Sequence, residues 1–226
     1  MPHPVALITG AAHRLGAHTA ETLHARGWNV VIHYRGREQQ ARALADKLNQ
    51  QRPESAVCYH ADLTDMNQLR QLAEQACAHW GQLNALVNNA SVFYPNPTED
   101  ASEQDWDTIL GANLKAPFFL LQQCLPALKA ASGSVVNMID IYSEKPLKDH
   151  PLYCASKAGL AALTRSWARD LAPDVRVNGV SPGAMGSAHP LNAPYQAFET
   201  SDGWITCGAA NQRTWERLLT ALDNPQ

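Results

Sequence analysis

Three residues with complementary chemistry lie close together in the chain: Asp140, Tyr153 and Lys157. Tyr153 and Lys157 are four residues apart, so on a helix they lie one turn apart on the same face. An ammonium group beside a tyrosine can stabilise the phenolate and lower the tyrosine pKa, which lets the side chain donate a proton near neutral pH. This arrangement is typical of a reductase. On the pair alone, an ordinary surface helix remains the alternative.

Composition limits the kinds of protein that could carry these residues. The chain has 226 residues, 45% of them hydrophobic, which favours one large α/β domain. The formal net charge of −3 and the absence of a basic stripe argue against nucleic acid and anionic membranes as partners and favour a small-molecule substrate. Met1–Pro4 leads into a strand without a secretion signal, and the five scattered cysteines are odd in number, so we expect a cytoplasmic protein with no metal site.

Short apolar runs alternate with longer amphipathic stretches, which predicts a Rossmann-like α/β fold with a doubly wound parallel sheet. The expected strands are Val5–Thr9, Trp28–Tyr34, Ala56–His60, Ala85–Asn88, Ser134–Ile139 and Val175–Val180. The expected helices are Leu15–Arg26, Arg37–Gln51, Met66–Trp80, Glu103–Ala130 and Leu152–Leu171. Pro117 and Pro126 lie within the fourth stretch, which predicts two helices or one kinked helix there.

The first expected strand leads into Thr9–Gly16, a glycine-containing turn followed by a helix. This placement allows backbone amides and a helix N-terminus to receive a pyrophosphate. We expect Gly10 to permit the tight turn and Gly16 to let the backbone approach the ligand. The spacing differs from the usual Gly-x-Gly-x-x-Gly pattern, and ordinary turn glycines are the alternative.

The second expected strand ends in His33-Tyr34-Arg35-Gly36-Arg37, where a site for NAD would place an acidic residue. Positive groups here, together with Arg14, would instead pair with a 2′-phosphate, which predicts NADPH as the cofactor. The alternative is a solvated basic loop. Asp62 could accept a hydrogen bond from the adenine amino group and Asn88–Ala90 could line the ribose, although either could be a cap or turn residue.

Taken together, residues 4–184 resemble the short-chain dehydrogenases/reductases, and most closely their pteridine reductase subgroup. Four features carry this resemblance. Arg14 occupies a position where most members have glycine, the second strand ends in His33-Tyr34-Arg35, Asp140 replaces the usual catalytic serine, and Asn88–Pro95 is similar to a pterin-binding segment.

The resemblance implies a role for each matching residue. Tyr153 would donate the proton, Lys157 would lower its pKa and bind the nicotinamide ribose, and Asp140 would face the pterin. Asn113 would kink a helix and hold a proton-relay water, and Ser91 and Phe93 would bind and stack on the substrate. The residues expected to bind NADPH are Gly10, Arg14, Leu15, Gly16, His33, Tyr34, Arg35, Asp62, Leu63, Asn89, Ala90, Tyr153, Lys157, Pro182 and Gly183.

The function implied is reduction of a dihydropterin or dihydrofolate to the tetrahydro form. Hydride delivery to a carbon–nitrogen double bond places negative charge on nitrogen, which a nearby acid must meet. A carboxylate at Asp140 suits ring amino and N–H groups better than the developing oxyanion of a ketone. The alternatives are a carbonyl reductase of the same superfamily and an inactive NADPH-binding module.

The resemblance stops at about Ala184, and residues 185–226 instead resemble an internal piece of a class III CoA-transferase. We expect residues 1–184 to form an incomplete reductase domain that lacks the usual last strand and substrate-loop helices. The tail is then either an unrelated, poorly ordered fragment or a segment that supplies the missing strand, since Trp204–Gly208 has strand-like content. The resemblance implies that the missing last strand and its helix would have formed one of the two tetramer interfaces. We therefore expect at most a homodimer, through the fourth and fifth helical stretches, and no tetramer.

Overall fold

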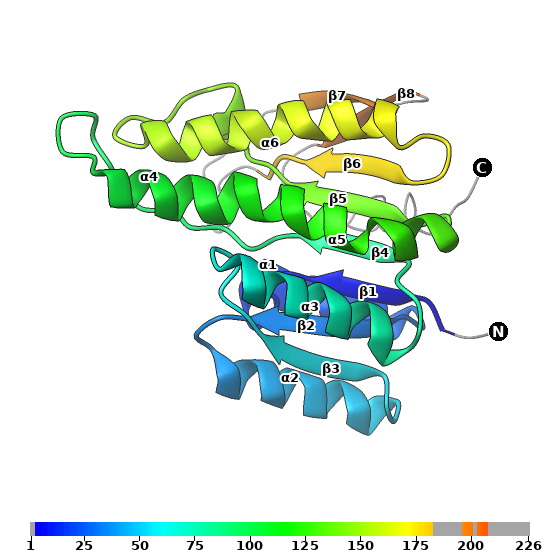
Figure 1. The fold of residues 1–226 in the computed structure, drawn as a ribbon. Coiled ribbons are helices and arrows are strands. Elements are labelled where there is room, and N and C mark those ends of the chain that lie inside the picture. Colours follow the sequence, from blue (N-terminus) through cyan, green and yellow to red (C-terminus); the bar gives the residue numbers. More distant parts are fainter. Residues whose placement is uncertain (1–2, 183–195, 201–202, 208–226) are drawn as a thin grey trace.

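The computed structural model describes residues 3–182, 196–200 and 203–207, and it contains a six-stranded parallel sheet with helices on both faces (Figure 1). The strand order is β3-β2-β1-β4-β5-β6, which confirms the predicted Rossmann-like, doubly wound arrangement. The strands are β1 (Val5–Ile8), β2 (Asn29–Tyr34), β3 (Ala56–His60), β4 (Ala85–Asn88), β5 (Ser134–Met138) and β6 (Arg176–Val180). The order reverses between β1 and β4, and ligands of such sheets bind beyond the carboxyl ends of the strands at this point.

The helices divide between the two faces of the sheet. They are α1 (Arg14–Ala25), α2 (Glu38–Gln51), α3 (Met66–His79), α4 (Glu103–Leu110), α5 (Ala116–Ala130) and α6 (Pro151–Asp170). Apolar residues of α1 and α2 pack on one face, and those of α3, α5 and α6 pack on the other. Every predicted strand and helix is present, with most boundaries within one residue of the prediction.

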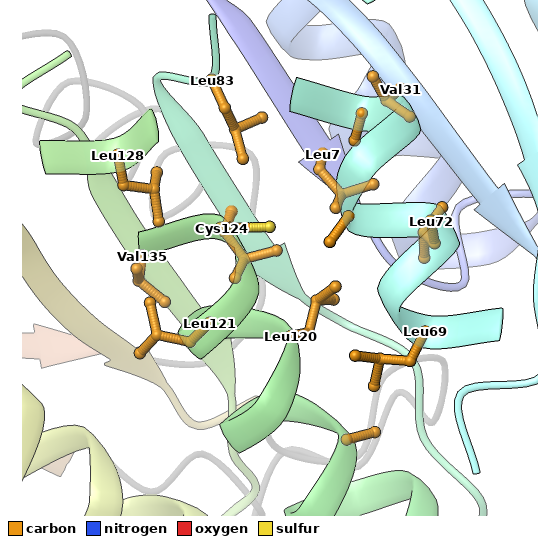
Figure 2. Close-up of a cluster of buried hydrophobic side chains, with 14 of the residues drawn as sticks. Leu7, Val31, Leu69, Leu72, Leu83, Leu120, Leu121, Cys124, Leu128 and Val135 are labelled. Carbon is orange, nitrogen blue, oxygen red and sulfur yellow. The ribbon is translucent and has the colours of Figure 1, made fainter. Parts of the chain in front are cut away.

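The central strand β1 shows how one short run of sequence serves both cores. Ala6 and Ile8 point to the α1 and α2 side, whereas Val5 and Leu7 point to the opposite side, because successive strand residues face opposite ways. All four are completely buried. Figure 2 shows Leu7 among side chains of the second face, including Leu72 of α3 and Leu120 of α5, two side chains that are also completely buried. This packing fixes the position of β1 and therefore of the turn that follows it.

The long stretch at 103–130 is interrupted, but at a different place from the predicted proline positions. A π-helical turn, η1 (Gly111–Lys115), joins α4 to α5 and contains Asn113. Pro117 lies in the first turn of α5, where its missing N–H has no helical partner to lose. Pro126 lies inside α5 without ending it. The prediction of two helices in this stretch is confirmed, but the break between them lies around Asn113 and not at a proline.

Two further strands follow the main sheet, β7 (Gln196–Thr200) and β8 (Gly203–Cys207). They pair with each other in an antiparallel hairpin, and in the described part of the chain they form a sheet separate from β6. The strand-like content expected at Trp204–Gly208 therefore corresponds to β8, but this strand does not complete the six-stranded sheet. The other residues of the proposed CoA-transferase-like tail, 185–195, 201–202 and 208–226, lie outside the described residues.

None of the described helices combines the length and the apolar character needed to cross a membrane.

Candidate active site

The glycine turn after β1 is held in place by neighbouring loops. Gly10 has a φ of +63°, which glycine adopts without strain, and its N–H donates to His33 Nδ1 at 3.0 Å. The Asn89 side-chain amide donates to the carbonyls of Thr9 and Gly10 at 2.8 and 3.2 Å. A Cβ on Gly16 would lie 2.5 Å from the Gly10 carbonyl oxygen. Gly16 thus lets α1 pack on the turn itself, whereas we expected it to make room for the ligand.

A cleft of about 650 Å³ lies in front of this turn, at the point where the strand order reverses. Helix α1 begins at the cleft without a side-chain cap from His13 and without an acidic residue in its first turn. Its first amides therefore suit an anion such as a pyrophosphate. The predicted residues that line the cleft are Gly10, Arg14, Leu15, Gly16, His33, Tyr34, Arg35, Asp62, Leu63, Asn89, Ala90 and Ser91.

Arg14 adopts an unusual backbone conformation at the mouth of the cleft. Its φ is +51°, in the left-handed region that favours glycine, and its side chain is exposed. A residue with a side chain at such a φ costs roughly 1–2 kcal/mol relative to the right-handed region. Strained backbone of this kind is often retained where the side chain has a functional role.

The side chain of His33 is buried behind the glycine turn, although its sequence context placed it among the groups facing the cofactor phosphate. The ring is 2% exposed, Nδ1 accepts from Gly10, and Nε2 donates to the Ala61 carbonyl at 3.0 Å. Burial lowers the His33 pKa to about 4, so the imidazole is neutral at pH 7. The positive groups at this end of β2 are therefore the arginines, and His33 adds no charge to them. Its ring instead connects the glycine turn to the end of β3.

The end of β2 is basic because it leads into Arg35 and Arg37, and the carboxylate that follows them, Glu38, is paired with Arg42. Glu38 forms an ion pair with Arg42 at 2.6 Å, and the pKa of the buried Tyr34 hydroxyl is raised first by burial and then by Glu38. Arg35 and Arg37 line the cleft with exposed side chains. This electrostatic environment suits a phosphate better than a ribose diol.

Asp62 is the single carboxylate among the described residues that line the cleft. Its Oδ1 accepts from the Thr64 amide at 2.9 Å and from the Thr64 hydroxyl at 2.7 Å. Burial acts to raise the Asp62 pKa, but these bonds and the charge of Arg35 outweigh it, so the pKa is lowered. Asp62 is therefore an ionised acceptor at neutral pH and could receive a hydrogen bond from an amino group.

The reactive residues predicted from sequence meet where α6 passes the end of β5. The Tyr153 hydroxyl donates to Asp140 Oδ2 at 2.7 Å, and the other Asp140 oxygen accepts from the Tyr142 amide at 3.1 Å, capping the short 3₁₀ helix η2 (Ile141–Ser143). Lys157 Nζ donates to the Met138 carbonyl at 2.8 Å and lies 5.6 Å from the centre of the Tyr153 ring. Asp140, Tyr153 and Lys157 therefore form one cluster.

Burial controls the proton affinities in this cluster. It raises the Tyr153 pKa well above its ordinary value, the Asp140 carboxylate raises it further, and a hydrogen bond from Ser91 opposes the rise. Burial also lowers the Lys157 pKa to about 8, against the opposing effect of Asp140. Lys157 Nζ faces the Tyr153 ring and the Met138 carbonyl, and the expectation that it lowers the tyrosine pKa stays a prediction. Tyr153 is a neutral hydroxyl that can donate a proton.

Asn113 lies in the π turn and is completely buried. Its Oδ1 accepts from the Val92 amide at 2.7 Å, and its Nδ2 donates to the Val92 carbonyl at 2.9 Å and to Ser156 Oγ at 3.2 Å. The helix irregularity expected at this asparagine is confirmed. Its side chain also joins the segment after β4 to helix α6.

The segment after β4 places Ser91 and Phe93 beside the reactive cluster. Phe93 is 53% exposed, although its ring stacks on His150 with centroids 4.6 Å apart and meets Tyr153 edge-on at 4.7 Å. Ser91 lines the cleft and acts to lower the Tyr153 pKa. The cleft and the reactive cluster are therefore adjacent at Ser91.

Some residues at the cleft were not among the predicted site residues. His13 and Arg37 are two of them, and His13 Nδ1 is a buried polar atom without a hydrogen-bond partner among the described residues. Burial, Arg37 and Arg14 all lower the His13 pKa. The position of His13, directly before Arg14 in the glycine turn, could have indicated from sequence that this residue lines the cleft. Of the predicted residues outside the cleft, Pro182 follows β6, whereas Gly183 lies outside the described residues.

Comparison with known families agrees with this geometry. The family model "short chain dehydrogenase" matches residues 4–194. The chain belongs to the short-chain dehydrogenase family. It is therefore related to oxidoreductases that use a nicotinamide cofactor and act on small molecules, and the cleft at the glycine turn is the expected place for that cofactor.

Several characterised short-chain dehydrogenases are similar over most of the chain. Pteridine reductase 1 of Leishmania tarentolae is 36% identical over 235 aligned residues, covering 87% of this chain and 81% of the relative. Trans-4-hydroxycyclohexanecarboxylate dehydrogenase of Sinomonas cyclohexanicum is 37% identical, covering 80% and 72%. A 3-oxoacyl-[acyl-carrier-protein] reductase of Staphylococcus aureus is 32% identical, covering 79% and 73%. These relatives share the family, but their names indicate different substrates.

Proposed function

We propose that this short-chain dehydrogenase is an NADPH-dependent pteridine reductase that converts a dihydropterin or dihydrofolate to the tetrahydro form. The observation that carries the proposal is the Asp140 carboxylate, whose Oδ2 lies 2.7 Å from the Tyr153 hydroxyl oxygen. Asp140 is half-buried and has one further bond, to the Tyr142 amide. An acceptor of this kind suits a substrate that presents N–H groups.

The carboxylate also argues against a ketone as the preferred substrate. Reduction of a ketone develops negative charge on oxygen, and a carboxylate beside that oxygen would repel it. Reduction of a carbon–nitrogen double bond develops the charge on nitrogen, which takes up a proton, while neighbouring ring amino groups donate to the carboxylate. The same side chain therefore disfavours one reaction and favours the other.

The chain's residues also account for the proton. The bound nicotinamide supplies a hydride. Tyr153 is neutral at pH 7, because its pKa is raised by burial and then by Asp140, so it keeps a proton available for the reduced nitrogen. Ser91 acts to lower the Tyr153 pKa and so favours the anion that remains after transfer. Lys157 lies beneath the ring and lends its positive charge to the same site.

The preference for NADPH rests on the basic end of β2. Arg14, Arg35 and Arg37 line the cleft, and the neighbouring Glu38 is occupied by Arg42. The pyrophosphate would lie against the glycine turn and the first amides of α1. The 2′-phosphate would then face the arginines.

The substrate would lie against Phe93. This ring combines 53% exposure with a fixed orientation between His150 and Tyr153, which suits stacking with a planar heterocycle. The name of the Leishmania tarentolae relative supports a pterin.

A carbonyl reductase is the second candidate, and the names of the Staphylococcus aureus and Sinomonas cyclohexanicum relatives favour it. We also propose residues 1–184 as the reductase unit, and a homodimer through α4, α5 and α6.

The deciding experiment follows NADPH oxidation by absorbance with dihydrobiopterin, dihydrofolate or a 3-oxoacyl ester as substrate, and uses Tyr153→Phe as control. We expect turnover with the dihydropterins and a loss of about 10²–10⁴-fold in the control. Preference for the ester would instead support the carbonyl reductase. Thermal stabilisation by NADPH without turnover of any substrate would indicate an inactive nucleotide-binding module.

A further inference from the structure

Helix α6 carries Tyr153 and Lys157, yet it lacks a cap from its own sequence. His150 at the N-cap position makes no side-chain capping bond, and Pro151 has no N–H to be capped. The first free amide of the helix is therefore that of Leu152. A helix start normally satisfies such an amide with the side chain of the N-cap residue.

The amide of Leu152 is satisfied from the segment after β4. It donates to Asn96 Oδ1 at 3.1 Å, across 56 residues of sequence. Asn96 is 3% exposed, and its Nδ2 donates to the Tyr94 carbonyl at 2.9 Å. Its own backbone N–H donates to the Asp149 carbonyl at 2.7 Å. Asn96 thus joins two segments that come from different parts of the chain.

The two joined segments carry the groups that the proposed reaction needs to hold together. Phe93 lies three residues before Asn96, and Tyr153 directly follows Leu152. The rings of Phe93 and Tyr153 meet edge-on, and Phe93 also stacks on His150. The connection is therefore adjacent to both the proposed substrate platform and the proton donor.

Several features keep this connection rigid. Asn96 lies between Pro95 and Pro97, which restrict the backbone on both sides. The start of the segment is fixed where Val92 bonds Asn113. Asp149 has a φ of +60°, in the left-handed region. Its carbonyl accepts from the Asn96 amide, and this bond helps to hold the backbone in that conformation.

We propose that Asn96 is a positioning residue, which caps α6 from the neighbouring segment and thereby fixes Phe93 relative to Tyr153. This inference rests on the proposed function. Loss of the cap would leave the half-buried Leu152 amide and Tyr94 carbonyl without these partners and would free the two segments to separate. Small displacements of reacting groups cost large factors in rate. The nucleotide cleft does not include Asn96, so NADPH binding should be unaffected.

Three variants test this role. Asn96→Ala removes both side-chain bonds, whereas Asn96→Asp keeps the acceptor for Leu152 and places a favourable negative charge at the start of α6. Asn49→Ala is the matched control, because Asn49 accepts from the Ser55 and Ala56 amides and donates to the Ala56 carbonyl, in α2 and next to β3. It removes a comparable set of bonds outside the candidate active site.

For Asn96→Ala we expect kcat/KM for dihydropterin to fall about tenfold or more, with the Kd for NADPH within about twofold of the wild type. Asn96→Asp should recover most of this loss, and Asn49→Ala should lower Tm without changing the kinetics. Equal kinetics for Asn96→Ala and Asn49→Ala would show that Asn96 is only structural. Failure of Asn96→Asp to recover activity would overturn the capping role.

Hydrogen exchange separates this inference from the proposed function. If the wild type reduces no dihydropterin, the proposed function fails, but the connection can still be tested without a substrate. We expect the amides of residues 91–96 and 152–154 to exchange faster in Asn96→Ala and to be unchanged in Asn49→Ala. Unchanged exchange in Asn96→Ala would overturn the proposed connection, whatever the chain reduces.

Discussion

The Tyr153 hydroxyl and the Asp140 carboxylate share a hydrogen bond of 2.7 Å, and Asp140 also caps the short helix that follows it through the Tyr142 amide. The proton of the tyrosine is therefore directed at a carboxylate. This relationship makes the identity of residue 140 the main determinant of substrate class in the proposed reaction.

Asp140→Ser should move the preference from dihydropterin towards ketone. Serine can still accept from the Tyr142 amide, so the local fold should persist, and the Tyr153 pKa should fall because a charge that raises it has gone. We expect the ratio of kcat/KM values for dihydropterin and a 3-oxoacyl ester to fall by at least about tenfold, measured by NADPH oxidation. An unchanged ratio would contradict the role given to Asp140. Asp65→Ser, in a helix cap outside the candidate active site, is a matched control.

Lys157 should reduce stability at neutral pH. Its pKa is about 8 in the folded chain, below the ordinary 10.5, so between these values the unfolded chain binds a proton that the folded chain does not. Stability from this group therefore rises with pH across that window. Lys157→Met should increase the free energy of unfolding at pH 7 by about 1–3 kcal/mol while abolishing turnover.

Urea unfolding measures this effect. The advantage of Lys157→Met over the wild type should shrink as the pH rises from 8 towards 10.5. If the difference in the free energy of unfolding stayed constant across this pH range, the lowered pKa of Lys157 would not be its cause.

Arg14→Gly should separate stability from cofactor preference. Glycine adopts the observed φ of +51° without strain, so the free energy of unfolding should change by no more than about 1 kcal/mol. The lost guanidinium should weaken NADPH binding by about tenfold while leaving NADH binding nearly unchanged. Titration of cofactor fluorescence measures both constants. An equal loss for NADPH and NADH would place Arg14 away from the 2′-phosphate.

His33→Phe should damage the glycine turn without removing a positive charge. The Gly10 amide and the buried Ala61 carbonyl would lose these partners, which predicts a stability loss of about 1–3 kcal/mol and weaker binding of both NADPH and NADH. His33→Gln retains a donor and an acceptor and should be milder. Selective loss of NADPH binding alone would restore the phosphate role that the sequence suggested.

The sheet and its helices could be predicted from sequence because each element has a clear pattern. The strands are short apolar runs, and β1 needs apolar residues at every position because both of its faces are buried. The interruption of the long helix was misplaced because prolines are visible in the sequence, whereas the π turn depends on Asn113 bonding Val92, a contact between distant residues.

The candidate site was predictable in its membership but less so in its geometry. The motif residues at the cleft are brought together as expected. The orientation of His33, the bond of Lys157 to the Met138 carbonyl and the capping role of Asn96 depend on partners more than ten residues away in the sequence. Residue type and spacing do not encode such partners, so these roles needed the structure.

The π turn at Gly111–Lys115 has a consequence for how this part of the chain can change. A π turn closes hydrogen bonds five residues apart instead of four, so it holds about one residue more than a regular helical turn. Deleting the extra residue there would restore a regular turn and leave α5 close to its present phase relative to α4. Deleting a residue from the regular first turn of α5 would instead rotate everything beyond it by about 100°, and Leu120 and Cys124 would then leave the buried face of α5. The irregular turn therefore takes up one residue without moving the buried face of α5, so a change of length is tolerated there and not in the helix beyond it.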